Sequence, residues 1–226
     1  MPGDRAAQQP MISGAKDPAM TRQHVLSLLG CALVLGQLGV ASAATGTITG
    51  QLTYTMAQTA INDAVVWAEP VGALSTFPPP AQPAEMAQVQ LAFTPRVLPV
   101  LVGTTVDFPN RDTVYHSVFS FARQQRFEIG LYPPGESRTV TFDKPGLVKV
   151  FCNIHDQMFG AILVLPTPYF STSIPGGTFT LAHVPPGTYT VRVWHERLQG
   201  APHTVTVTAG ATTTLALVLQ PRRREE

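Results

Sequence analysis

Apolar and polar residues alternate in short runs along most of the chain, and turn-forming Gly, Pro, Asn or Asp residues separate these runs. A period of two is typical of a half-buried β-strand, because successive side chains of a strand point to opposite faces of its sheet. The clearest runs are "GTITGQLTYT", "AVVWAEP", "HSVFSF", "LVKVF", "AILVLP", "GTYTVRVWH" and "TTTLALVL". Their number and spacing predict an all-β protein built from β-sandwiches, with helix a minority at best.

The first 43 residues predict an export leader that includes a signal peptide. Met20 and Arg22 open a short basic start, an apolar stretch follows, and Ala41-Ser42-Ala43 has the small-residue pattern of a cleavage site. Cleavage near Ala43 predicts a periplasmic or otherwise exported protein with no stable membrane span left. A retained membrane anchor is the alternative, and the glycines that interrupt the apolar stretch count against it.

Composition and charge argue against a nucleic-acid partner. Charged residues make up only 13% of the chain. Without the leader, 12 basic and 12 acidic side chains remain, so the mature protein is close to neutral. The basic cluster Arg222-Arg223-Arg224 lies in the terminal segment 221–226, which we interpret as a solvated charged tail.

Two proline-rich breaks divide the mature chain. Residues 73–85, which include "STFPPPAQPAE", predict a linker, because proline lacks a backbone donor and interrupts regular strands and helices. A second break follows Leu165 at "PTPYFSTSIPGG". Residues 86–166, between the two breaks, form one predicted domain.

The segments on either side of this domain, 45–72 and 167–220, carry related signals. The first opens with G-x-I-x-G-x-L, and the second contains "VPPGTYTV" and "TVTVTAGATTT". These motifs resemble the carboxypeptidase-regulatory-like, transthyretin-like β-sandwich family, in which the two portions are consecutive. The resemblance implies a second, small β-sandwich that is discontinuous because residues 86–166 are inserted into one of its turns. The alternative is a tandem layout, in which residues 45–70 supply the first strands of the middle domain.

The segment "VFCNIHDQMFG", residues 150–160, contains the candidate chemistry. Cys31 is removed with the predicted leader, so Cys152 has no disulfide partner within the mature chain. A buried, inert cysteine is one interpretation. The other is that a metal ion occupies the thiol.

The residues around this cysteine favour a metal site. A loop after the strand "LVKVF" can aim Cys152, His155 and Met158 at one point, because a loop is free of the alternation that governs a strand. Thiolate, imidazole and thioether form a soft nitrogen and sulfur set that suits copper. A second imidazole completes the trigonal His₂Cys pattern with an axial Met that is typical of blue copper, and His116 at the head of "HSVFSF" is the candidate.

At these positions the sequence resembles the cupredoxin family of plastocyanin, amicyanin and azurin, over residues 86–166. The resemblance rests on the early His116, on the turn F-D-K-P-G before the strand of Cys152, and on the short C-x-x-H-x-x-M loop, which is similar to that of amicyanin. It implies a Greek-key β-sandwich that holds one copper ion, alternating between Cu(I) and Cu(II). It also implies an electron carrier with a transient redox protein partner, not an enzyme.

Two positions depart from the family pattern or leave a choice open. Ser117 stands where many family members have asparagine. Gln157 is an alternative to Met158 as the axial ligand, and the spacing favours Met158.

Other functions would use part of the same residue set. A periplasmic copper carrier or storage protein would bind the ion through these residues and deliver the ion instead of an electron. Structural zinc sites usually draw on paired cysteines. A Cys-His protease pairing would place both residues on one loop, with no evident orienting Asn or Asp beyond Asp156. A third class of function is a structural or binding module whose copper unit has lost its metal site. The complete set of four predicted ligands argues against this alternative.

Overall fold

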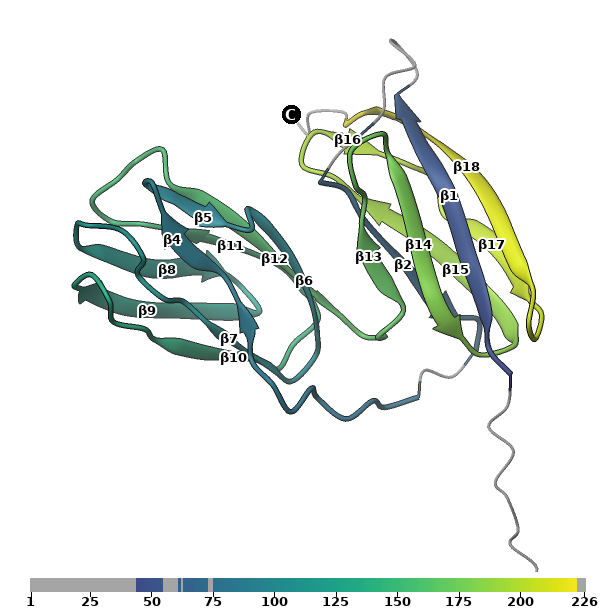
Figure 1. Ribbon diagram of the computed structural model, residues 1–226, viewed down its shortest axis with the longest axis horizontal. Helices are drawn as coiled ribbons and strands as arrows, with labels where there is room; N and C mark the ends of the chain where they lie inside the picture. Colours follow the sequence, from purple (N-terminus) through teal and green to yellow (C-terminus); the bar gives the residue numbers. More distant parts are fainter. Residues whose placement is uncertain (1–43, 55–60, 62, 73–74, 223–226) are drawn as a thin grey trace, which may run out of the picture. The chain divides into compact units, whose positions relative to one another are not determined.

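The computed structural model describes residues 44–54, 61, 63–72 and 75–222, and every regular element in them is a strand (Figure 1). The prediction of an all-β protein is therefore confirmed. This part of the chain includes no helix long and apolar enough to cross a membrane. The predicted leader, residues 1–43, lies outside the described residues.

The strands, in chain order, are β1 (Gly46–Tyr54), β2 (Val65–Pro70), β3 (Ala84–Glu85), β4 (Ala87–Val89), β5 (Ala92–Thr94), β6 (Val97–Leu101), β7 (Thr104–Asp107), β8 (His116–Ala122), β9 (Gln125–Tyr132), β10 (Thr139–Phe142), β11 (Gly146–Phe151), β12 (Phe159–Leu165), β13 (Phe170–Thr172), β14 (Thr178–Val184), β15 (Gly187–Trp194), β16 (Leu198–Gln199), β17 (His203–Val207) and β18 (Thr212–Pro221).

Strands from both sides of the middle segment pair with one another in a single sheet. Its order is β13-β2-β15-β16-β18-β1-β14, and β17 pairs with β15. In Figure 1, β1 lies between β14, which is antiparallel to it, and β18, which is parallel. Inward side chains of these strands form one apolar core, made mainly of Ile48, Leu52, Val66, Ala68, Phe179, Leu181, Val191, Val207, Leu217 and Leu219.

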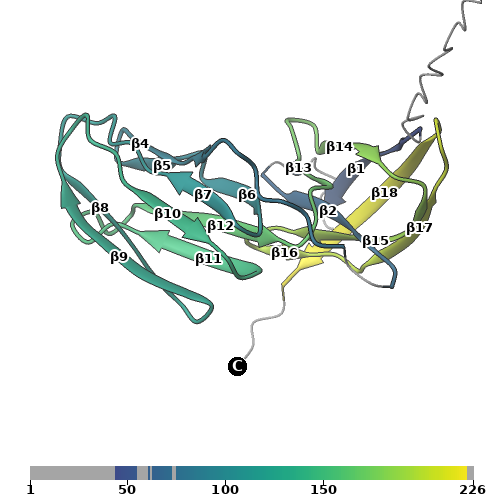
Figure 2. The same cartoon turned by 90° about the horizontal axis from the view of Figure 1, so that it is seen from below.

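The middle segment forms its own sheets around a second core. A five-stranded sheet has the order β6-β12-β11-β8-β9, a three-stranded sheet has the order β10-β7-β3, and β4 and β5 form a hairpin (Figure 2). Strands of all these sheets contribute to the core, whose main members are Met86, Phe93, Val106, Phe108, Val118, Tyr132, Phe142, Val148, Val150, Cys152, Met158 and Ile162. The candidate cysteine and methionine thus belong to this core.

Two element boundaries differ from the sequence prediction. The described residues 75–83 of the predicted linker contain no strand, whereas its last two residues, 84 and 85, form β3, which pairs in parallel with β7. They can do so because they follow Pro83 and keep their own backbone donors. At the other end, β18 continues to Pro221, one residue into the predicted tail.

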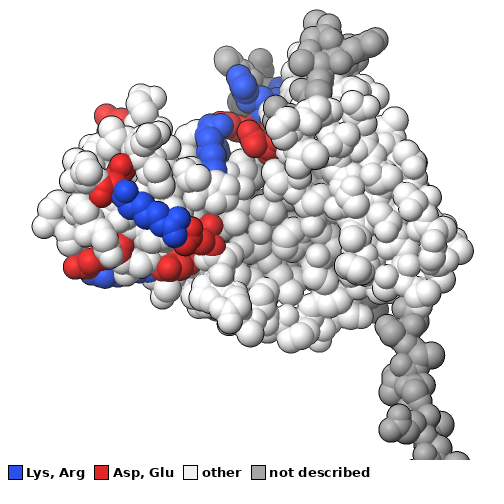
Figure 3. Space-filling model, viewed as in Figure 1, with Lys and Arg blue, Asp and Glu red and all other residues white. Residues whose placement is uncertain are grey.

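Charged side chains are unevenly distributed over the described strands. β1, β14 and β18 contain no Lys, Arg, Asp or Glu residue, and their face is white in Figure 3. The middle segment carries two exposed ion pairs, Arg111 with Glu85 and Arg138 with Glu136, each with a nitrogen to oxygen distance of 2.6 Å. Exposed pairs of this kind contribute little to stability.

Candidate metal centre

Neighbouring antiparallel strands bring His116 and Cys152 to the same end of the five-stranded sheet. β8 begins at His116, and Cys152 directly follows Phe151, the last residue of β11. Because strand side chains alternate, Val150 and Cys152 both point into the core, and His116 is buried on the same side. His116 is 0% exposed and Cys152 is 5% exposed.

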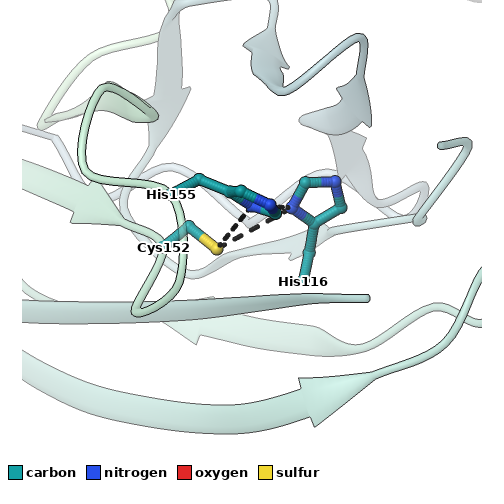
Figure 4. Close-up of side chains that lie close together, drawn as sticks. All are labelled: His116, Cys152 and His155. Carbon is teal, nitrogen blue, oxygen red and sulfur yellow. Dashed lines mark hydrogen bonds between the residues drawn. The ribbon is translucent and has the colours of Figure 1, made fainter. Parts of the chain in front are cut away.

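The loop after Cys152 adds a second imidazole at this end of the sheet. Figure 4 shows His116, Cys152 and His155 converging, with the two Nδ1 atoms toward the sulfur. The Cys152 Sγ atom lies 3.7 Å from His116 Nδ1 and 3.6 Å from His155 Nδ1, and the two Nδ1 atoms lie 3.1 Å apart. The ligand atoms of all three residues lie within 4.8 Å of one another. The structure therefore brings together three of the four predicted ligands.

The fourth predicted ligand, Met158, is buried beside this group. Met158 is 1% exposed and shares the core that contains Cys152, whereas Gln157 is exposed. The loop closes on itself, because the Met158 N–H donates to the His155 carbonyl at 2.9 Å and the Cys152 N–H donates to the Met158 carbonyl at 3.3 Å. The difference in burial favours Met158 over Gln157 as an axial ligand.

The His116 ring is fixed from its far side by a carboxylate. Its Nε2 lies 2.8 Å from Asp112 Oδ2, and the Asp112 side chain is 14% exposed. Burial alone would raise the pKa of Asp112, but hydrogen bonds from the Leu91 N–H, the His116 ring and the Gln90 N–H outweigh it and lower the pKa. An ionised carboxylate can only accept, so a neutral His116 ring bonded to it carries its proton on Nε2 and has its Nδ1 lone pair on the side of the sulfur.

Ser117 braces the loop that carries the cysteine. Its N–H and its hydroxyl lie 3.5 Å and 3.8 Å from Cys152 Sγ, and the hydroxyl accepts from the Asn153 N–H at 2.9 Å. Ser117 is fully buried. In this chain the serine thus holds both the sulfur and the residue that follows it.

A buried polar cluster supports the segment between β7 and β8. Asn110 Nδ2 donates to the Val114 and Tyr132 carbonyls at 2.9 Å and 3.2 Å. The Tyr132 hydroxyl accepts from Gln88 Nε2 and donates to the Phe108 carbonyl at 2.9 Å. Burial raises the pKa of Tyr132 to about 12, so its hydroxyl stays a neutral donor.

The Tyr132→Phe variant tests this support. Removing the hydroxyl leaves the buried Gln88 amide and the Phe108 carbonyl without their partner, so we expect the free energy of unfolding to fall by about 1–3 kcal/mol in a urea titration. Tyr115 is 55% exposed, and the control Tyr115→Phe is expected to change it by less than about 0.5 kcal/mol. Equal losses in the two variants would contradict this role.

The residues present fit a soft metal ion. Two imidazole nitrogens and one thiol, all within 4.8 Å of one another, form a borderline to soft donor set. Among the described residues, Cys152 is a free cysteine. Sequence reasoning singled out Ser117 as a departure from the family pattern but missed Asp112 as a part of the site, and the one available signal was that Asp112 precedes His116 by four positions.

Comparison with known proteins gives likenesses to both parts of the chain. Residues 167–215 match the family described as polysaccharide lyase family 4, domain II. No curated protein matches the sequence. The resemblance of the flanking segments to the carboxypeptidase-regulatory-like family stays a prediction.

Among solved structures, the chain is similar to a purple cupredoxin from Nitrosopumilus maritimus, with 24% identity over 36% of this chain and 99% of that chain, and a TM-score of 0.34. A copper-containing nitrite reductase from Thermus scotoductus SA-01 shows 31% identity and a TM-score of 0.36, and the match covers 43% of this chain but only 25% of that one. A mutant of amicyanin in its reduced state shows 21% identity over 44% of this chain and 99% of that chain, with a TM-score of 0.35.

Proposed function

We propose that this chain is an exported blue copper protein that shuttles single electrons between redox partners and is not an enzyme. One copper ion would be held by His116, Cys152, His155 and Met158. The observation that carries the proposal is the convergence of two imidazole Nδ1 atoms on a buried, unpaired thiol at 3.6 Å and 3.7 Å.

The surroundings of the ligands support an electron carrier. Bound copper supplies a one-electron change between Cu(I) and Cu(II). Asp112 holds the His116 ring, Ser117 holds the sulfur, and the loop of His155 is closed by its own backbone hydrogen bonds. Ligands held this firmly would move little when the charge of the ion changes, which keeps the barrier to electron transfer low.

The surface beside the site supports a transient protein partner. His155 lies on a loop and is half-buried, so it is the ligand nearest to solvent. Its neighbour Ile154 is 48% exposed, and Val114 and Tyr115, which precede His116, are 41% and 55% exposed. Exposed apolar side chains next to a redox centre suit a brief, weak encounter.

The proposal is tested by adding Cu(II) to the purified mature protein. We expect one equivalent to bind and to produce an intense visible absorption from the thiolate, which disappears on reduction and returns on oxidation over repeated cycles. A colourless protein that still binds Zn(II) tightly would refute the blue copper assignment.

The same sample separates an electron carrier from a copper carrier. After reduction, a Cu(I) chelator of graded strength is added and the retained copper is measured. An electron carrier is expected to keep the ion in both oxidation states, whereas ready release of Cu(I) would support delivery of the metal.

A further inference from the structure

The Asp112 carboxylate receives three hydrogen bonds from two distant parts of the middle segment. Its Oδ2 accepts from His116 Nε2 and from the Leu91 N–H, each at 2.8 Å. Its Oδ1 accepts from the Gln90 N–H, also at 2.8 Å. One side chain therefore contacts both a predicted metal ligand and the turn of the β4–β5 hairpin.

That turn has a backbone conformation that its residues do not favour. Val89 pairs with Ala92, so Gln90 and Leu91 form a two-residue hairpin turn. Their φ angles are 52° and 59°, in the left-handed region where Gly and Asn are the usual residues. A glutamine and a leucine adopt this conformation only when the surroundings hold it. The two backbone bonds to Asp112 supply that hold.

The base of the hairpin is fixed to the segment that carries Asp112. The Gln88 N–H donates to the Pro109 carbonyl at 2.9 Å, and the Arg111 N–H donates to the Gln88 carbonyl at 3.0 Å. The Asp112 N–H donates to Asn110 Oδ1 at 3.1 Å. These hydrogen bonds hold the segment of Asp112 against the base of the hairpin. The carboxylate therefore has little freedom to move with the turn alone or with the imidazole alone.

We propose that Asp112 is a positioning residue that couples the strained turn at Gln90 and Leu91 to the His116 ring, so that metal binding and the order of this surface turn depend on each other. This inference rests on the proposed metal site, but not on its redox role. Leu91 is 51% exposed, so the coupled turn reaches the surface beside the centre. The coupling is reciprocal: if metal binding at His116 favours the ordered turn, the ordered turn favours metal binding by the same free energy.

Zn(II) is the probe, because it needs no redox change. In the unloaded wild type, nitrogen-detected NMR of the imidazoles is expected to show His116 with its proton on Nε2. Zinc binding is expected to slow hydrogen exchange of the Gln90 and Leu91 amides several-fold. His116 with its proton on Nδ1, or amide exchange that zinc leaves unchanged, would overturn the proposal.

Asp112→Asn is the matched variant. The amide offers one acceptor oxygen where the carboxylate offers two, and its NH₂ group must face either the imidazole or a backbone N–H. We expect a 10–100-fold loss of zinc affinity, measured by chelator competition, and no protection of the turn amides by zinc. Asp143→Asn, at an exposed position, is the control and is expected to behave as the wild type. Equal zinc affinities in the two variants would count against Asp112.

Should Asp112→Asn fail to fold, the replacement is made in a chain that also carries Gln90→Asn and Leu91→Gly, residues that favour this turn without support. In that background the turn is kept and only the hold on His116 is removed. The zinc affinity is again expected to fall 10–100-fold, and an unchanged affinity would overturn the proposal. A wild type that meets these expectations but shows no reversible copper redox cycle would refute the electron carrier and leave the role of Asp112 standing.

Discussion

Replacing Cys152 by serine is expected to abolish the visible absorption of the copper-loaded protein while the fold is kept. The absorption of the proposed site comes from the thiolate, and a serine hydroxyl stays protonated near neutral pH. The Cys152 sulfur lies 3.7 Å and 3.6 Å from the two imidazole Nδ1 atoms, so the replacement also removes the sulfur ligand of the proposed metal site. We expect copper affinity to fall by several orders of magnitude.

The fold should survive this change because serine is close to cysteine in size and would inherit a partner. The Ser117 N–H, which lies 3.5 Å from the sulfur, is placed to donate to the new hydroxyl. We therefore expect the free energy of unfolding of the metal-free chain to change by about 1 kcal/mol. The measurements are visible absorption after Cu(II) addition and a urea titration of the metal-free protein.

Ser120→Ala provides the control for this experiment. Ser120 is 1% exposed on β8 and its hydroxyl accepts from the Ala122 N–H at 3.1 Å, so the variant tests whether a small buried change in the same sheet disturbs the colour. We expect it to keep the full absorption. A Cys152→Ser protein that kept the band would show that another group produces it and that the proposed site is wrong.

The strands could be predicted from the sequence, but their partners could not. The alternation in "HSVFSF" and "LVKVF" predicts which residues form β8 and β11 and which faces they bury. Alternation does not report pairing, so the parallel register of β1 with β18 and of β6 with β12 comes only from the structure. The hairpin turn at Gln90 and Leu91 was missed because neither residue is a turn former.

The donor residues of the site could be grouped from the sequence, and their support could not. Cys152 and His155 share one loop, and chemistry alone suggested His116 as a second imidazole. The Asp112 carboxylate accepts hydrogen bonds from Gln90 and Leu91, more than twenty positions upstream, and no local sequence pattern predicts them. Long-range contacts of this kind depend on the pairing of the sheets, and so does the way the ligands are held.

The two imidazoles are expected to differ sharply when each is removed and replaced from solution. His155→Gly and His116→Gly should each lose the visible absorption on Cu(II) addition, because each removes one of the two nitrogen donors. Free imidazole is then titrated into both copper-loaded variants. We expect it to restore most of the colour to His155→Gly and little or none to His116→Gly.

The reason for this difference is access. His155 lies half-buried on the loop, so its removal opens a path from solvent to the sulfur. His116 is 0% exposed and ends against Asp112, so its removal leaves an enclosed gap that a free imidazole would have to enter through the packed core. Equal recovery in the two variants would contradict the assignment of His155 as the solvent-side ligand. It would also count against a partner contact at the exposed Ile154, because that proposal depends on His155 being the ligand nearest to solvent.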